Sequence, residues 1–145
     1  MSRTVTRMSV GAALLLTGYF IGQASTREVV MAQQQTGTRV FELRTYTVPD
    51  ATQLDMLNAR FRDHTRRIFD RHGMTSIGYW TPIDTPNTLI YILAHPSQEE
   101  AKKHWAEFNA DPEWQKVRTE TREKGLTGVK TESRFLQPTD YSAIK

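Results

Sequence analysis

Two hydrophobic periodicities alternate along the chain, and their order constrains the fold more than any other feature. Apolar and polar residues alternate with a period of two, as in strands, over residues 40–47 and 129–136, and residues 75–82 and 88–95 are predicted to be two further strands on either side of a turn. Apolar residues recur at intervals of three and four, as in helices, over residues 50–73 and 97–124. The order is therefore βαββαβ, which predicts an α+β, ferredoxin-like domain: an antiparallel four-stranded sheet with two helices on one face.

Residues that begin and end helices or form turns stand between these segments. Asp50 is a suitable N-cap for the first helix, and Gly73 is a suitable end. The sequence "IDTPNT" at residues 83–88 predicts the turn of an antiparallel hairpin. Pro112 interrupts the second helix, because proline is tolerated in a first turn but not inside a helix. Residues 137–145 show neither periodicity and are predicted to be a tail.

The first strand has one apolar and one polar face. We expect the helices to cover its apolar face, made of Phe41, Leu43 and Thr45. The polar face would then lie on the bare side of the sheet: Glu42, Arg44 and Tyr46. Two helices cover only one face of such a sheet, so packing of the bare faces of two copies predicts a homodimer.

Residues 1–35 differ in composition from the remainder, and we interpret residues 36–145 as the domain. Arg3 and Arg7 precede an uncharged run over residues 8–22, which is typical of an export signal and is shorter than a bilayer span. We expect a periplasmic or extracellular protein whose leader is cleaved. An uncleaved N-terminal membrane anchor is the alternative, and it is the one route by which we expect contact with a membrane.

The charge of the domain itself is close to zero. Residues 1–32 hold three of the 19 basic residues and one of the 16 acidic residues, so the overall net charge of +3 owes much to the leader. Nucleic-acid binding normally needs a concentrated basic face, and we expect none here. The chain has no cysteine, which excludes disulfide stapling of the exported domain.

Three groups of side chains are candidates for ligand binding. In the strand triplet, Arg44 would bind an anionic group and Tyr46 would donate a hydrogen bond beside Glu42; the alternative is an ion pair with an interface tyrosine. Histidines in the helical stripes would act as a general base or a haem ligand, or else occupy ordinary core positions: His64, His72 and His104. Aromatic residues would line an apolar pocket or simply fill the core: Trp80, Tyr91, Trp105 and Trp114. No metal-binding motif accompanies them, so no metal site is predicted.

Four sequence segments resemble the NIPSNAP family: "FELRTYTV", the "HG" that ends the first helix, "DPEW" at residues 111–114 and "SRFLQPTDYS". The resemblance covers most of residues 40–143. It implies a dimeric α+β barrel, in which two ferredoxin-like subunits pack sheet to sheet. The wider superfamily includes monooxygenases, haem-degrading enzymes, dismutases and isomerases, so the fold alone selects no reaction.

These observations favour an exported NIPSNAP-like homodimer that binds a small, partly apolar ligand in the layer between sheet and helices. No cofactor is required, although haem is a possibility. The first alternative is a cofactor-poor monooxygenase or isomerase, with a histidine as base and Arg44 or Tyr46 stabilising an oxyanion. The second alternative is a protein-interaction module without catalysis. The sequence leaves open whether the protein is an enzyme.

Overall fold

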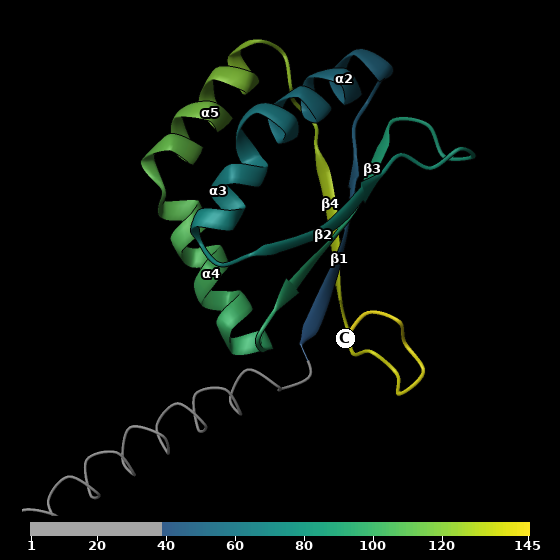
Figure 1. The fold of residues 1–145 in the computed structure, drawn as a ribbon. Coiled ribbons are helices and arrows are strands. Elements are labelled where there is room, and N and C mark those ends of the chain that lie inside the picture. Colours follow the sequence, from purple (N-terminus) through teal and green to yellow (C-terminus); the bar gives the residue numbers. More distant parts are fainter. Residues whose placement is uncertain (1–38) are drawn as a thin grey trace, which may run out of the picture. The chain divides into compact units, whose positions relative to one another are not determined.

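Helices cover one face of an antiparallel sheet in the computed structural model, which describes residues 39–145 (Figure 1). The strands are β1 (Val40–Thr47), β2 (Thr75–Trp80), β3 (Thr88–His95) and β4 (Lys130–Leu136). The helical segments are α2 (Ala51–Arg60), the π-helix η1 (Phe61–Thr65), α3 (Arg66–Arg71), α4 (Gln98–Ala110) and α5 (Pro112–Glu123). The four strands have the order β2-β3-β1-β4 with antiparallel neighbours. This confirms the predicted ferredoxin-like subunit.

The first helical region is interrupted by a π-helical turn, which the sequence did not predict. A π-turn holds one more residue than an α-turn and therefore shifts the following side chains around the helix axis. Phe61 is buried as expected, and the next buried side chain along the helix is that of Thr65, which is only 1% exposed. His64, which was expected in the apolar stripe, is half-buried.

The two faces of β1 are the reverse of those predicted. The helices cover Glu42, Arg44 and Tyr46: Glu42 accepts a hydrogen bond from Trp105 of α4, and the Tyr46 ring packs on Phe61. The bare side of the sheet holds the apolar set instead, where Phe41 lies beside Ile77 and Ile92. The expectation failed because Glu42 and Arg44 form a buried ion pair, which lets two charged residues occupy core-facing positions.

A cluster of aromatic rings forms the centre of the layer between sheet and helices. Tyr91 of β3 is fully buried, and its ring centroid lies 5.1 Å from that of Phe61 and 6.0 Å from that of Phe69. Phe69 also packs edge-on against Trp105, with 5.5 Å between centroids. Such edge and tilted contacts suit the charge distribution of aromatic rings and add to the burial of apolar area.

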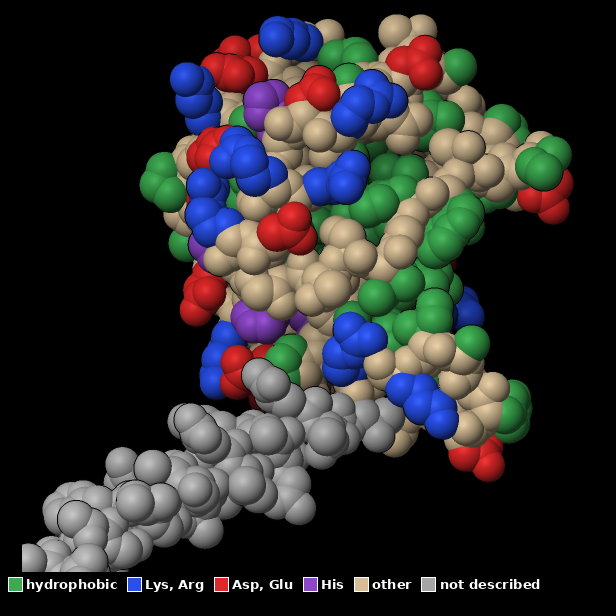
Figure 2. All heavy atoms as spheres, viewed as in Figure 1, with side chains coloured by type: hydrophobic (Ala, Val, Ile, Leu, Met, Phe, Trp, Pro, Cys, Tyr) green, Lys and Arg blue, Asp and Glu red, His purple; other side chains and the backbone are tan. Residues whose placement is uncertain are grey.

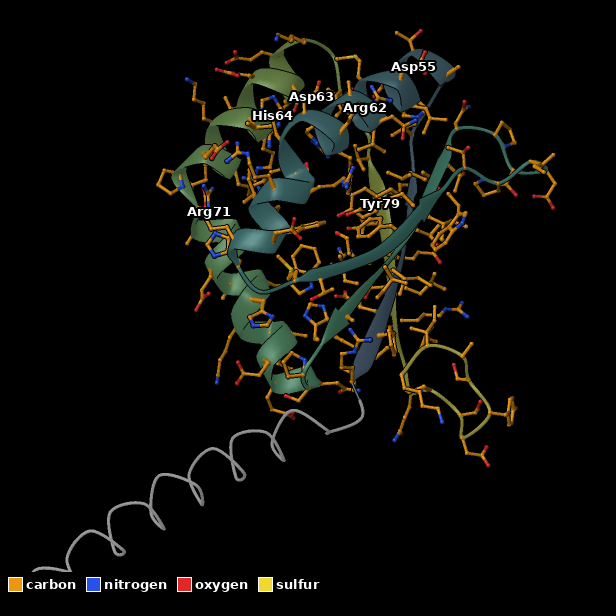
Figure 3. All side chains as sticks on the ribbon, viewed as in Figure 1. Asp55, Arg62, Asp63, His64, Arg71 and Tyr79 are labelled. Carbon is orange, nitrogen blue, oxygen red and sulfur yellow. The ribbon has the colours of Figure 1, made fainter. Side chains whose placement is uncertain are left out.

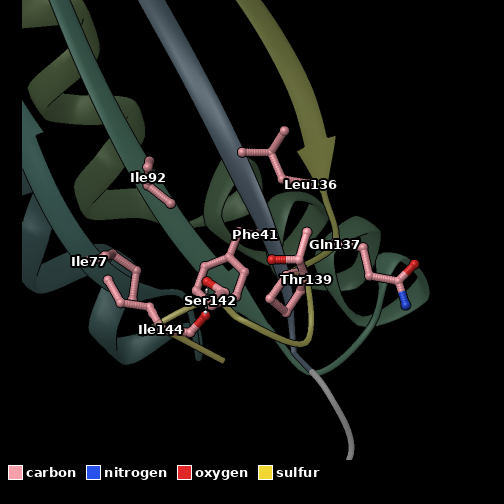
Figure 4. Close-up of a pocket in the computed structure, with 9 residues that line it drawn as sticks. Phe41, Ile77, Ile92, Leu136, Gln137, Thr139, Ser142 and Ile144 are labelled. Carbon is pink, nitrogen blue, oxygen red and sulfur yellow. Dashed lines mark hydrogen bonds between the residues drawn. The ribbon is translucent and has the colours of Figure 1, made fainter.

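The tail after β4 has no helix or strand and folds back along one end of the bare sheet face (Figure 4). A hollow of about 390 Å³ lies between the sheet residues Phe41, Ile77 and Ile92 and the tail, which contributes Ile144 among others. Arg39 holds the tail through two hydrogen bonds to the carbonyl oxygen of Lys145, at 3.0 and 2.6 Å. The hollow is mainly apolar.

Charged side chains gather over the helices, whereas apolar side chains are exposed toward the sheet (Figure 2). Within residues 39–145, no helix has the length and hydrophobicity that a membrane crossing requires. The predicted export leader, residues 1–35, lies outside the described residues. Export and the alternative of a membrane anchor therefore stay predictions.

Candidate functional site

A cavity of about 490 Å³ lies in the layer between the sheet and the helices, near the β4 edge. Its sheet wall comes from β1 and β4, and its helical wall comes from α2 and α5. Three arginines, Arg60, Arg118 and Arg122, lie beside aromatic and aliphatic side chains in this wall. The remaining lining residues are Tyr46, Trp114, Leu126, Thr127, Gly128, Val129 and Thr131. We refer to this space as the arginine cavity.

Arg60 is the most deeply placed of the three arginines and is only 8% exposed. Its guanidinium lies over the Trp114 ring, 5.1 Å from the ring centroid, in a cation–π contact. One long hydrogen bond of 3.5 Å runs from its Nη1 to Thr121 Oγ1, and its Nε has no hydrogen-bond partner. A buried guanidinium with so few partners retains most of its hydrogen-bonding capacity for a ligand.

The positive charge of the arginine cavity is not neutralised by the protein. Among residues 39–145, no carboxylate forms an ion pair with Arg60, Arg118 or Arg122. Burial lowers the pKa of Arg60, and the nearby charge of Arg118 acts in the same direction. Both effects mean that the charged guanidinium is held in an unfavourable environment, which an anion in the cavity would relieve.

A second polar group in the same layer is centred on Glu42, which is 2% exposed. Its Oε1 accepts hydrogen bonds from Arg44 Nη1 and Ser133 Oγ, both at 2.6 Å, and its Oε2 accepts one from Trp105 Nε1 at 2.7 Å. His95 Nε2 lies 3.4 Å from Oε2. We refer to these five residues as the Glu42 cluster, and its carboxylate is already occupied by protein donors.

The charge state of the Glu42 cluster follows from these contacts. Burial alone would raise the pKa of Glu42, but the nearby His95 imidazole, the Ser133 and Trp105 donors and the positive charge of Arg44 lower it from 4.5 to about 2. His95 Nδ1 also lies 3.3 Å from His104 Nδ1, and burial together with His95 lowers the pKa of His104 below 6.5. Glu42 is thus ionised and His104 neutral near pH 7.

The predicted site residues fall into separate places. Five of the ten candidates lie in or beside the Glu42 cluster and the aromatic core: Glu42, Arg44, Tyr91, His104 and Trp105. Tyr46 and Trp114 line the arginine cavity instead. The Tyr91 hydroxyl is buried without a partner, and burial raises its pKa well above 10.

His64, His72 and Trp80 do not join either group. His64 points to a hollow between α2 and α5, whereas Tyr79 lies under the helices (Figure 3). Trp80 is 51% exposed and folds over Gly78, where an added Cβ would lie 2.5 Å from the indole. Successive strand residues point to opposite faces, so Tyr79 takes the inner place and Trp80 the outer one. Tyr79, and not Trp80, is therefore the aromatic residue that β2 contributes to the layer between sheet and helices.

His72 has a structural position at the end of α3. Its Nε2 lies 2.7 Å from Asp111 Oδ2, which also accepts a hydrogen bond from Arg71 at 2.7 Å. The other carboxylate oxygen of Asp111 accepts from the backbone amides of Glu113 and Trp114, so Asp111 is the N-cap of α5. This cap joins α3 to the first turn of α5, which carries Trp114 to the arginine cavity.

Replacing Asp111 with alanine is expected to lower the free energy of unfolding by about 1–2 kcal/mol, because the amides of the first turn of α5 lose their acceptor. Asp111→Asn keeps a capping oxygen and should lose clearly less. Urea unfolding of both variants checks this. Equal losses in the two variants would contradict the capping role of Asp111.

Of the ten lining residues, sequence reasoning named Tyr46 and Trp114 and missed the other eight, including Arg60, Arg118 and Arg122. Arg60 lies among other charged residues on its helix, a pattern that usually indicates a solvent-exposed face. The spacing of Arg118 and Arg122, four apart on one face of α5, is the feature that could have indicated a basic wall. Within residues 39–145, no group of three or more His, Asp or Glu side chains is arranged to hold a metal ion.

Solved structures with this fold include several NIPSNAP proteins. A NIPSNAP family protein of unknown function from Agrobacterium tumefaciens is 21% identical with a TM-score of 0.64, and the match covers 76% of this chain and 96% of that chain. A NIPSNAP-like domain protein from Burkholderia xenovorans is 20% identical with a TM-score of 0.64, covering 73% and 90%. A variant of SnoaB, a cofactor-independent oxygenase from Streptomyces nogalater, is 16% identical with a TM-score of 0.50, covering 73% and 97%.

Because all three sequence identities are low, these likenesses establish the fold alone. No curated protein matches the chain in sequence. The sequence model of the NIPSNAP family matches residues 41–143, which include every strand and helix described above except Val40, the first residue of β1. The chain therefore belongs to the NIPSNAP family.

Proposed function

We propose that this protein is a homodimeric binding domain, and that each subunit takes one small, partly apolar molecule into the arginine cavity. The observation that carries the proposal is the composition of the cavity wall. Hydroxyl and guanidinium groups line a space of about 490 Å³ together with aromatic and aliphatic side chains: Tyr46, Trp114, Leu126 and Val129. Small-molecule sites in proteins commonly combine an apolar lining with a few polar groups.

The homodimer is supported by the bare side of the sheet. Phe41, Leu43, Ile90 and Ile92 lie on this side, since each alternates along its strand with residues that pack under the helices. The tail covers Phe41, whereas Leu43, Ile90 and Ile92 remain partly exposed. Apolar sheet surface exposed to water is unfavourable in a monomer, and a second copy presents the same surface.

Binding is better supported than the enzymatic alternative. A general base has to lie within hydrogen-bond reach of its substrate. Neither a carboxylate nor an imidazole is among the lining residues of the arginine cavity in the described part of the chain. The neighbour SnoaB is a cofactor-independent oxygenase, but its likeness to this chain extends to the fold alone. The histidines considered as bases, His64, His72 and His104, lie elsewhere.

A substitution that fills the cavity tests the proposed function. Thr131→Trp places an indole into the space from the β4 wall, whereas Thr119→Trp makes the same change on the exposed side of α5. Calorimetric titration uses 2-naphthoate and its neutral amide, 2-naphthamide. We expect at least one probe to bind the unmodified protein with a Kd below about 1 mM. Thr131→Trp should abolish this binding and Thr119→Trp should keep it.

Two results would contradict the proposed site. Absence of binding by both probes to the unmodified protein would return the domain to the interaction-module hypothesis. Equal binding to the Thr131→Trp variant would place the ligand somewhere other than the arginine cavity. Circular dichroism of both tryptophan variants verifies that the fold is kept.

A further inference from the structure

We propose that the ligand of the arginine cavity is a small organic carboxylate, whose charged group lies at Arg60 and whose apolar body packs against Tyr46 and Trp114. The inference rests on the proposed function and names its ligand class. The first step is the charge of the wall. Arg60, Arg118 and Arg122 all line the cavity, and no carboxylate of the described residues neutralises them.

The second step is the burial of Arg60. More than nine-tenths of this residue is buried, yet its contacts to the protein are one 3.5 Å hydrogen bond and the face of Trp114. A buried charge is normally paired, because its removal from water is costly. A negatively charged group in the adjacent cavity would supply the counter-charge that Arg60 lacks. A planar carboxylate matches the fork of guanidinium donors in both charge and geometry.

The third step concerns how Arg60 is held in place. It is the last residue of α2, and the π-helical turn begins directly after it. Thr65 Oγ1 donates a hydrogen bond of 3.2 Å to the Arg60 carbonyl oxygen across this turn. Single π-turns occur frequently at functional sites, where they change the direction of a side chain. Here the turn fixes the backbone from which the guanidinium enters the cavity wall.

The fourth step is the remainder of the ligand. Tyr46 and Trp114 offer ring surfaces, and Leu126 and Val129 add aliphatic surface to the lining. Inorganic anions would leave these surfaces without a partner. An organic acid satisfies both kinds of wall, since its apolar part removes ring surface from water while its charge meets Arg60.

Calorimetric titration with 2-naphthoate and 2-naphthamide tests the inference, using protein purified after expression of the full chain. The two probes have nearly the same shape and differ in charge. We expect 2-naphthoate to bind at least about tenfold more tightly than 2-naphthamide, as charge-assisted hydrogen bonds are the stronger ones. Arg60→Met should reduce 2-naphthoate affinity by about tenfold to a hundredfold while 2-naphthamide affinity changes little.

Arg62→Met is the matched control, because Arg62 is exposed and is not among the cavity residues. Its affinity for 2-naphthoate should equal that of the unmodified protein. Should Arg60→Met fail to fold, the double variant Arg118→Met with Arg122→Met removes positive charge from exposed positions of α5. That variant should weaken 2-naphthoate binding by several fold.

The outcomes separate this inference from the proposed function. Equal affinity for the two probes, or unchanged 2-naphthoate affinity in a folded Arg60→Met variant, would overturn the carboxylate and leave the binding site standing. Failure of both probes to bind would overturn both proposals. A preference for 2-naphthoate over 2-naphthamide that the Arg60→Met variant loses and the Arg62→Met variant keeps would support a carboxylate ligand.

Discussion

Replacing Glu42 with glutamine is expected to lower the free energy of unfolding by about 3–5 kcal/mol, the largest loss that we expect from a single polar substitution here. Glu42 is the counter-ion of Arg44, and both side chains lie under the helices. Glutamine keeps the size of the side chain but removes its charge, so the guanidinium stays buried without compensation. The Trp105 and Ser133 donors also lose their charged acceptor.

Chemical denaturation at pH 7 measures this loss. Glu123→Gln is the control, because it makes the same change at an exposed position near the end of α5. Its effect should stay within about 0.5 kcal/mol. A loss below about 1 kcal/mol for Glu42→Gln would contradict the role of the Glu42 cluster in stability.

The same cluster predicts how stability changes in acid. The pKa of Glu42 is lowered from 4.5 to about 2 in the folded protein. A carboxylate of lowered pKa contributes stability that is fully present above its unfolded value, and this contribution is lost as pH falls. We therefore expect a loss of about 3 kcal/mol between pH 4.5 and about 2 that comes from this one group. The Glu42→Gln variant lacks this component, so the difference between the two proteins should shrink over the same interval.

The order of strands and helices could be predicted because it depends on local patterns. Alternation over residues 40–47, the apolar run of residues 89–94 and the turn between residues 80 and 88 each specify their element without long-range information. Asp111 before Pro112 specifies a break between two helices, and the structure has α4 and α5 on either side of it. These features follow from backbone sterics and capping, which act within a few residues.

The face of β1 that the helices cover could not be predicted, because it depends on a pairing across the sheet. An alternating strand is normally placed with its apolar side inward. Glu42 and Arg44 break that rule by pairing with each other, and Ser133 from the neighbouring β4 completes the arrangement. Nothing near Glu42 in the sequence reveals that Ser133 lies beside it. The apolar side, with Phe41, was therefore assigned to the wrong layer.

The arginine cavity was missed for a similar reason. Arg60 belongs to a run of charged residues on a helix, where solvent exposure is the usual outcome. Its burial depends on Trp114, which follows 54 residues later and covers the guanidinium from α5. The π-turn after Arg60 also has no sequence pattern that distinguishes it from a continuous α-helix. Tyr46 and Trp114 were among the candidates, but the arginines that lie beside them in the cavity wall were not.

Replacing Ile92 with glutamate is expected to convert the proposed homodimer into monomers. Ile92 lies on the bare side of the sheet, paired with Leu43 of β1 and Gly78 of β2, near the centre of the surface on which a second copy would pack. A carboxylate placed there has to lose its water without gaining a partner. A cost of about 3 kcal/mol is moderate for such burial and weakens association by more than about a hundredfold.

Light scattering should give twice the chain mass for the unmodified protein and one chain mass for Ile92→Glu. Ile83→Glu is the matched control, because Ile83 is fully exposed in the loop between β2 and β3 and should tolerate the same charge. A monomeric unmodified protein at micromolar concentration would refute the homodimer, as would a dimeric Ile92→Glu variant.

Titration of the Ile92→Glu variant with 2-naphthoate shows whether ligand binding depends on the dimer. The arginine cavity opens between β4 and α5, on the other side of the sheet from Ile92, so a folded monomeric variant should still bind this probe. Loss of binding together with the dimer would mean that the second copy shapes the cavity from behind the sheet.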